Sequence, residues 1–253
     1  MKKLSVIFAS FLIGISICLD SCNIYITGPI KGDRNIITSE GAVSPFRKIH
    51  IIGSATVNYH ASSEYRVLVT ADSNLLEYIK IDTKENTLYI GTENGSYSFT
   101  KFVVDVYCPH VRKVSISGSG NFECMDKMVV STFEAIISGS GKIEGTVTCD
   151  DFFTTILGSG EVTIVGKSKN STINISGSGG FDGRLFKTNN VEAGINGSGY
   201  AKIWVANYLN AYVLGSGNIV YRGNPRVDFS NFGSGQLKNE PYILQYEYRV
   251  LKM

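Results

Sequence analysis

The triplet Gly-Ser-Gly occurs seven times between residues 118 and 235, at nearly constant spacing. Successive copies start 21, 19, 19, 20, 18 and 18 residues apart, about 19 on average, and hold 14 of the 27 glycines. A constant period of this length is typical of a solenoid, in which each repeat forms one coil and packs on its neighbours. The repeat glycines are Gly118, Gly120, Gly139, Gly141, Gly158, Gly160, Gly177, Gly179, Gly197, Gly199, Gly215, Gly217, Gly233 and Gly235.

Three columns of aligned positions around the triplets are apolar in almost every copy. The column two residues before the first glycine holds Ile116, Ile137, Ile156, Ile175, Ile195, Val213 and Asn231. The column four before holds Val114, Ala135, Thr154, Ile173, Ala193, Ala211 and Phe229, and the column four after holds Phe122, Ile143, Val162, Phe181, Ala201, Ile219 and Leu237. The positions between these columns are mainly polar. Alternation with a period of two is typical of β-strands, so the sequence predicts an all-β, parallel β-helix with coils of about 19 residues.

Two structural roles are open for the repeat glycines. They could relieve crowding inside the coils, or they could adopt a positive φ at a corner between two short strands. We expect the serines between them to form an outward, structural ladder of hydroxyl groups. These serines are Ser119, Ser140, Ser159, Ser178, Ser198, Ser216 and Ser234.

The chain before residue 112 and the chain after residue 240 have different predicted roles. The stretch 49–57 reproduces the repeat pattern with Gly53-Ser54-Ala55, which makes a degenerate eighth copy, and it opens a segment of strand-like runs at 42–111. We expect 42–111 to cap the solenoid of 112–240, and 22–41 to be a tether. An open solenoid end exposes unpaired strand edges, so we expect 241–253 to form a closing C-terminal cap strand.

The first residues have the pattern of an export signal. A basic start is followed by an apolar run at 4–19, which is short for a membrane span. The run ends in Leu19-Asp20-Ser21-Cys22, which resembles the lipobox of bacterial lipoproteins. Residues 1–21 are therefore predicted to be a signal peptide and Cys22 the site of lipid attachment, which would tether the chain to a membrane. Release by an ordinary signal peptidase, or a retained anchor, are the alternatives.

Charge and cysteine content narrow the possible partners. The formal net charge is +2, and removal of the signal peptide with its two lysines and one aspartate would leave +1. Such a balance predicts no nucleic-acid partner. The remaining cysteines are Cys108, Cys124 and Cys149, an odd number that excludes a disulfide scaffold. They are predicted to be buried apolar side chains, or Cys108 and Cys124 form one bridge.

The sequence offers little chemistry for catalysis. His50, His60 and His110 form no pair with metal-binding spacing, and the Gly-Ser-Gly triplets lack the lysine and helix of a phosphate loop. We therefore predict no catalytic residues, no metal site and no cofactor. Because polysaccharide lyases and glycosidases also use β-helices, the one acidic pair to weigh is Glu123 and Glu144, which are expected on consecutive coils.

Exposed side chains on the coils suit contact with a ligand. Tyr200, Tyr212 and Asn218 occupy outward positions, where aromatic rings stack and amides form hydrogen bonds with glycans or proteins. An ordinary solvated strand face is the alternative for these positions. Trp204, the only tryptophan, is either exposed or buried in a turn.

The chain resembles the putative auto-transporter adhesin, head-GIN-domain family of exported bacterial proteins. The resemblance covers residues 42–240 and rests on the Ser-Gly-Ser-Gly coils and on the segments 46–51, 71–76, 88–90 and 104–109. It implies a right-handed parallel β-helix in a cell-envelope lipoprotein of Gram-negative bacteria, with no established catalytic residues to transfer.

The expected function is therefore that of a non-catalytic envelope lipoprotein, anchored in the outer membrane, which binds glycans or host or neighbouring surface proteins. It would face either the periplasm or the exterior. A structural or self-associating envelope protein is the second reading, and a carbohydrate-active enzyme the third. The oligomeric state is open.

Overall fold

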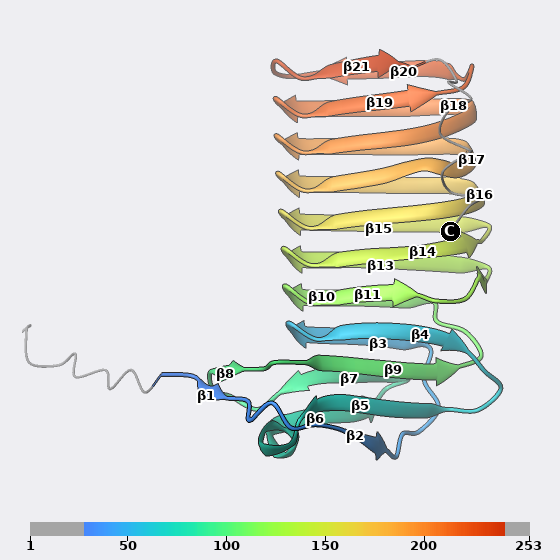
Figure 1. Cartoon of the computed structure of the whole chain (residues 1–253). Helices are drawn as coiled ribbons and strands as arrows, with labels where there is room; N and C mark the ends of the chain where they lie inside the picture. Colours follow the sequence, from blue (N-terminus) through green and yellow to red (C-terminus); the bar gives the residue numbers. More distant parts are fainter. Residues whose placement is uncertain (1–27, 241–253) are drawn as a thin grey trace, which may run out of the picture.

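The repeats stack as a parallel β-solenoid in the computed structural model, which describes residues 28–240 (Figure 1). Strands of successive coils pair in parallel and in register, so that Gly118 lies beside Gly139 and Gly139 beside Gly158. The predicted fold is thus confirmed. The solenoid strands are β10 (Lys113–Gly118), β11 (Asn121–Cys124), β12 (Met128–Val129), β13 (Thr132–Gly139), β14 (Lys142–Thr148), β15 (Asp151–Gly158), β16 (Glu161–Gly177), β17 (Gly180–Gly197), β18 (Tyr200–Gly215), β19 (Asn218–Arg222), β20 (Arg226–Asn231) and β21 (Gln236–Asn239).

Each coil contributes one strand segment before its triplet and one after it, and each segment pairs with its equivalents. We call the first set the entry sheet: β10, β13, β15, the second halves of β16, β17 and β18, and β20. The second set is the exit sheet: β11, β14, the first halves of β16, β17 and β18, and β19 and β21. The triplets form the corner that joins the two sheets.

The predicted inward columns form the core, except in the last coil. The first six members of each apolar column are buried, and all of them except Thr154 belong to a single hydrophobic cluster. In the seventh coil Phe229 and Asn231 are exposed and Leu237 is only half-buried. The prediction that Phe229 and Asn231 face the core is therefore wrong, and for Leu237 it is only partly confirmed. The physical reason is that β20 and β21 each pair on one side only among the described residues.

The two glycines of a triplet have different roles, so both proposed explanations apply. In the first six triplets the first glycine has φ between +118° and +132°, which side chains rarely tolerate, and it makes the corner. The second glycine is buried against the coil below. A Cβ added at Gly160 would lie 2.5 Å from Cγ2 of Ile137 and 2.8 Å from the carbonyl oxygen of Gly141.

A ladder of backbone hydrogen bonds runs along this corner. In each of the seven triplets the serine N–H donates to the carbonyl oxygen of the first glycine one coil below, at 2.9 Å. For the first triplet that acceptor is Gly53 of the degenerate copy. All seven serine residues are exposed, as predicted, and the Oγ of Ser234 donates to the Oγ of Ser216 at 3.1 Å.

The opposite corner of the middle coils contains a buried polar cluster. The hydroxyls of Ser168, Ser171 and Thr188 lie 2.9–3.1 Å from one another, and all three residues are buried. Because each hydroxyl can both donate and accept, the cluster satisfies these groups at the turn without water. These three hydroxyls therefore have a structural role.

The segment before residue 112 continues the solenoid at its lower end. It contains β3 (Lys48–Gly53), β4 (Thr56–Ala61), β5 (Arg66–Asp72), η1 (Ser73–Tyr78), β6 (Ile79–Lys84), β7 (Thr87–Thr92), β8 (Tyr97–Ser98) and β9 (Phe102–Cys108). β3 pairs in parallel with β10, and β4 with β11, so Gly53 aligns with Gly118 as the degenerate copy predicts. These two strands form the first coil of the entry and exit sheets. Antiparallel pairs β5–β9 and β6–β7 lie below them.

Part of the predicted tether belongs to the fold, which corrects the sequence analysis. β1 (Ile30–Lys31) pairs with β8, and β2 (Ile36–Gly41) runs antiparallel to β5. The reason lies in the buried carboxylate of Asp72, which accepts hydrogen bonds from the N–H groups of Arg34 at 2.9 Å and Thr100 at 2.7 Å. These bonds fix the residues before β2 against the cap. Between residues 28 and 240 no helix is long and apolar enough to cross a membrane.

Substitutions within one triplet test the role of the second glycine. We expect Gly160→Ala to lower the free energy of unfolding by about 2 kcal/mol, because its Cβ would overlap Ile137 and the backbone of the coil below. The matched control Ser159→Ala, at an exposed side chain, should change it by less than about 0.5 kcal/mol. Urea denaturation measures both. Equal midpoints for the two variants would contradict the crowding explanation.

Candidate binding surfaces

The structure separates the three predicted ligand residues onto two sheets. Tyr200 and Asn218 are direct neighbours on successive coils of the exit sheet. Tyr212 lies on the entry sheet, where it is the pairing partner of Gly194 and Ser230. A single ligand surface therefore cannot be formed by all three side chains together.

Both tyrosine rings lie over a glycine of the coil below. A Cβ at Gly180 would overlap the Tyr200 ring, and one at Gly194 would overlap the Tyr212 ring. Rings placed in this way fill the space that a strand glycine leaves open. The Tyr200 hydroxyl also donates to Oε1 of Glu161 at 2.7 Å, and burial together with this hydrogen bond raises the pKa of Tyr200 to about 12. The Tyr200 side chain is thus fixed by contacts within the protein, whereas the Tyr212 side chain is 47% exposed.

Three adjacent rows on the outer surface of the entry sheet are uncharged over seven coils, whereas the next row holds Lys113, Glu134, Glu192 and Asp228. We call these three rows the neutral face. It consists of the positions three before and one before the first glycine, together with the corner serines. The first two rows are Ser115, Ile136, Thr155, Asn174, Gly194, Tyr212 and Ser230, and Ser117, Ser138, Leu157, Ser176, Asn196, Leu214 and Phe232.

The neutral face becomes apolar toward the C-terminal coils. Leu214 is 48% exposed and Phe232 is 68% exposed, next to Tyr212. Leu157 adds a further exposed apolar side chain lower on the same row. Large apolar side chains gathered on one exposed surface are typical of interaction sites. The neutral face could have been found from the sequence by examining the outward columns of the repeats for charge as well as for hydrophobicity.

The outer surface of the exit sheet carries charged side chains of both signs, and two ion pairs lie on it. Lys142 Nζ lies 2.8 Å from Oε1 of Glu144, and the guanidinium of Arg184 lies 2.6 Å from Oδ2 of Asp182. Glu123 and Glu144 are neighbours on consecutive coils, as expected. The lysine that pairs with Glu144 partly neutralises this acidic pair. Among residues 28–240 no group of three or more His, Cys, Asp or Glu side chains could hold a metal ion.

Two of the histidines have structural partners. A ring nitrogen of His50 lies 3.0 Å from the Ser117 hydroxyl, and burial and the nearby charge of Lys113 lower the pKa of His50. His60 lies 3.1 Å from Oδ1 of Asp105 and stacks on Tyr107. His110 is exposed after the end of β9.

The three cysteines within residues 28–240 are free thiols, so Cys108 and Cys124 form no bridge. Cys108 and Cys149 are buried, as predicted, and burial raises the pKa of each to about 12. Cys124 is only half-buried, and its thiol donates to the backbone oxygen of Asp126 at 2.7 Å.

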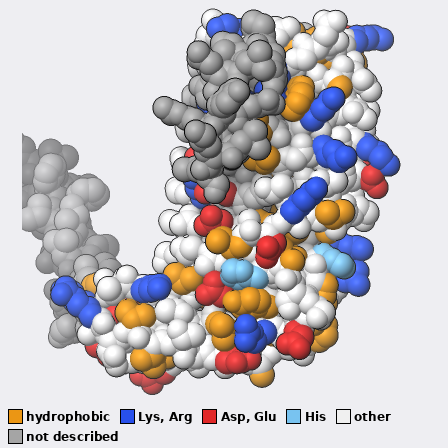
Figure 2. All heavy atoms as spheres, turned by 45° about the vertical axis from the view of Figure 1, so that its right-hand side comes forward, with side chains coloured by type: hydrophobic (Ala, Val, Ile, Leu, Met, Phe, Trp, Pro, Cys, Tyr) orange, Lys and Arg blue, Asp and Glu red, His pale blue; other side chains and the backbone are white. Residues whose placement is uncertain are grey.

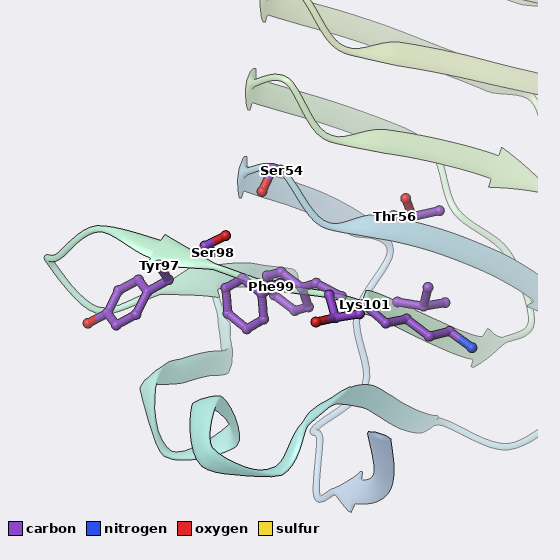
Figure 3. Close-up of a pocket in the computed structure, with 9 residues that line it drawn as sticks. Ser54, Thr56, Tyr97, Ser98, Phe99 and Lys101 are labelled. Carbon is purple, nitrogen blue, oxygen red and sulfur yellow. The ribbon is translucent and has the colours of Figure 1, made fainter. Parts of the chain in front are cut away.

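An open pocket of about 470 Å³ lies between the first coil and the cap (Figure 3). Its lining includes the hydroxyls of Ser54 and Thr56, the rings of Tyr97 and Phe99, and Lys101. Its lining has no carboxylate, thiol or imidazole side chain, and its ionisable side chains are Tyr97 and Lys101. Its polar, open character is typical of a surface contact and not of an enclosed ligand site.

Comparison with known protein families identifies the family of this chain. Residues 45–225 match the family model described as "Putative auto-transporter adhesin, head GIN domain". The chain belongs to this family. A comparison with curated proteins finds no match.

Solved structures with the same fold include proteins described as adhesins. A putative adhesin from Bacteroides fragilis superposes with a TM-score of 0.78 at 23% identity, covering 83% of this chain and 100% of that one. A putative lipid binding protein from Parabacteroides distasonis gives 0.71 at 25% identity, with 84% and 100% covered. A putative adhesin from the same species gives 0.69 at 24% identity, with 84% and 100% covered.

Three predictions concern residues outside the described range. These are the signal peptide, the lipid attachment at Cys22 and the cap strand at 241–253. Trp204, which the sequence left as exposed or buried, points outward and is partly exposed beside two cations.

Proposed function

We propose that this member of the head-GIN-domain adhesin family is a non-catalytic surface-binding module of the cell envelope, and that the neutral face is its contact surface. The observation that carries the proposal is the exposure of Tyr212, Leu214 and Phe232 on a surface without charged side chains. Such a surface can approach a ligand without removing water from ions, which is the largest cost of polar association.

The composition of the neutral face fits glycans or proteins as ligands. Its hydroxyl and amide side chains can donate and accept hydrogen bonds, and the open side of the Tyr212 ring can stack on a sugar or an apolar side chain. The Parabacteroides distasonis neighbour is described as lipid binding. In this chain the core between the two sheets is filled by packed side chains, which favours surface contact over lipid uptake.

Self-association is the second candidate, and the last coil supports it. β20 and β21 each pair on one side only among the described residues, and Phe229 is 38% exposed at this end. Unpaired strand edges of this kind recruit further strands. A chain that stays monomeric at micromolar concentration in equilibrium sedimentation would remove this candidate.

A double substitution tests the neutral face. We expect Tyr212→Ala with Leu214→Ala to weaken retention of the purified protein on a glycan array or a host-cell layer about tenfold, because it removes two exposed apolar anchors. Met125→Ser with Val129→Ser is the matched control, since those exposed apolar side chains lie outside the neutral face. Binding that survives the first pair of substitutions, or that both pairs weaken equally, would contradict the assignment.

The lipid anchor is a further part of this proposal. Transfer of a lipid to Cys22 would hold the module at the outer membrane, where a binding face has a surface to contact. Cells fed a fatty-acid probe should label the wild-type protein and fail to label Cys22→Ala, whereas Cys18→Ala should keep the label. Equal labelling of all three proteins, or none in the wild type, would contradict lipidation at this residue.

A further inference from the structure

The stack of glycine corners ends below the first coil. Every triplet has another corner directly beneath it, down to Gly53 of the degenerate copy. Below Gly53, β7 and β9 lie under β3 and β4, but residues 93–101 between them run outward and form β8 instead of a corner (Figure 1). A Cβ added at Gly53 would meet no atom within 4 Å, whereas one at Gly118 would lie 2.6 Å from the carbonyl oxygen of Gly53. The position where the next corner would lie is therefore open.

The pocket between the first coil and the cap lies at this position (Figure 3). Ser54 and Thr56 of the first coil form its upper side, and residues 97–103 form its lower side. We call it the corner recess. Because its volume of about 470 Å³ is open to solvent, it suits one residue of a longer ligand better than a small molecule that must be enclosed.

Backbone groups without a partner line the corner recess. The serine of each triplet donates its N–H to a glycine carbonyl one coil below, but the N–H of Ser54, at the equivalent position, has no acceptor among residues 28–240. On the lower side, the carbonyl oxygens of Ser96 and Ser98 accept hydrogen bonds from β1, so the N–H and C=O groups of Tyr97 point to the opposite edge of β8. Among the described strands β8 pairs with β1 alone. These backbone groups are strong donors and acceptors that a ligand can satisfy.

Lys101 is the one cation in the lining of the corner recess. Lys80 and Lys84 of the cap form ion pairs of 2.6 Å, whereas Lys101 forms none with any residue from 28 to 240. Its side chain is exposed, and the lining contains no carboxylate. On the edge of the solenoid opposite the glycine corner, by contrast, basic and acidic side chains lie on the same surface (Figure 2). The corner recess therefore presents a positive charge without an acidic partner.

The lower side of the corner recess is held in place by contacts within the protein. The buried carboxylate of Asp72 accepts hydrogen bonds from the backbone N–H groups of Thr100 at 2.7 Å and Lys101 at 3.4 Å. The ring of Phe99 stacks on the buried ring of Phe102, with their centres 4.6 Å apart. A site that is fixed before its ligand arrives loses less conformational freedom on binding.

We propose that the corner recess binds a carboxylated sugar residue of a glycan. Lys101 pairs with the carboxylate, and the hydroxyl side chains and free backbone groups around it can both donate hydrogen bonds to the sugar hydroxyls and accept them. The Tyr97 ring adds apolar surface for the CH groups of the sugar. A peptide that adds as a β-strand is a poorer fit, because β8 offers an edge of only two residues, Tyr97 and Ser98.

Backbone amide signals in nuclear magnetic resonance locate binding at single residues. Titration of the isotope-labelled purified protein with tetragalacturonate and with sialyllactose should shift the amide signals of Ser54 and Tyr97 in a saturable way. The two ligands distinguish a uronic acid from a sialic acid as the carboxylated sugar, and saturation by either one supports the proposal. The amide of Ser159, which already donates to Gly139, should not shift and is the internal control. Lactose, which has no carboxylate, should bind at least about fivefold more weakly.

Substitution of the lysine tests the charge. Lys101→Gln should weaken binding of the carboxylated sugar about fivefold, because the ion pair with the carboxylate is lost. Lys48→Gln, at an exposed lysine outside the corner recess, is the matched control and should bind within about twofold of the wild type. Both lysines are exposed and have no ion pair among the described residues, so unchanged thermal unfolding is expected for both variants.

Several results would overturn the proposal. These are no saturable shift with either carboxylated sugar, shifts at Ser159 as large as those at Ser54, lactose binding of equal affinity, or equal affinities of Lys101→Gln and the wild type. A short peptide of aspartate and glutamate that binds as tightly as the sugars would assign the recess to proteins instead. The double variant at Tyr212 and Leu214 should leave this titration unchanged, whether or not the neutral face binds its own ligand.

Discussion

The hydrogen bond from each corner serine N–H to the first-glycine carbonyl one coil below is the interaction on which the rest of the solenoid depends. It occurs in all seven triplets at 2.9 Å, and it requires the two backbones to approach at a point where neither glycine could carry a side chain. A shift of one residue between coils would bring a side chain to this point and turn the inward columns outward. The corner therefore fixes the register of both sheets.

A fixed register converts residues about 19 positions apart into vertical neighbours, and the surface chemistry of the protein follows from this. The same coils present the three uncharged rows of the neutral face on the entry sheet and charged rows on the exit sheet. Tyr212 and Leu214 belong to the first, and Lys187 and Trp204 end the second. Because each coil contributes one residue to each column, outward residues can be changed, or coils added, without altering the core.

Much of the fold could be predicted from the sequence because the signals that determine it are local and repeated. Alternation identified the inward columns, and Gly53-Ser54-Ala55 identified the first coil. The predictions that were wrong depend on contacts without a local signal. The pairing of residues 30–41 depends on the buried Asp72, and the exposure of Phe229 depends on the position of its coil at the end of the stack.

The candidate surfaces were less predictable for a similar reason. Outward parity placed Tyr200, Tyr212 and Asn218 at the surface, but parity alone does not say on which sheet a residue lies. Only the corner geometry separates Tyr212 from the other two. The neutral face is visible in the sequence once each column is examined for charge, which requires knowing which positions are vertical neighbours.

Native-state hydrogen exchange at the corner serines tests most directly whether the glycine corner holds the register. Ser140, Ser159, Ser178 and Ser198 have exposed side chains, and solvent exposure alone would predict rapid exchange of their amide protons. If the corner bonds are integral to the stack, these amides should be protected to the same degree as those of the adjacent strands β15, β16 and β17. Exchange at the rate of surface-loop amides, with the strands still protected, would show that the sheets hold the register without the corner.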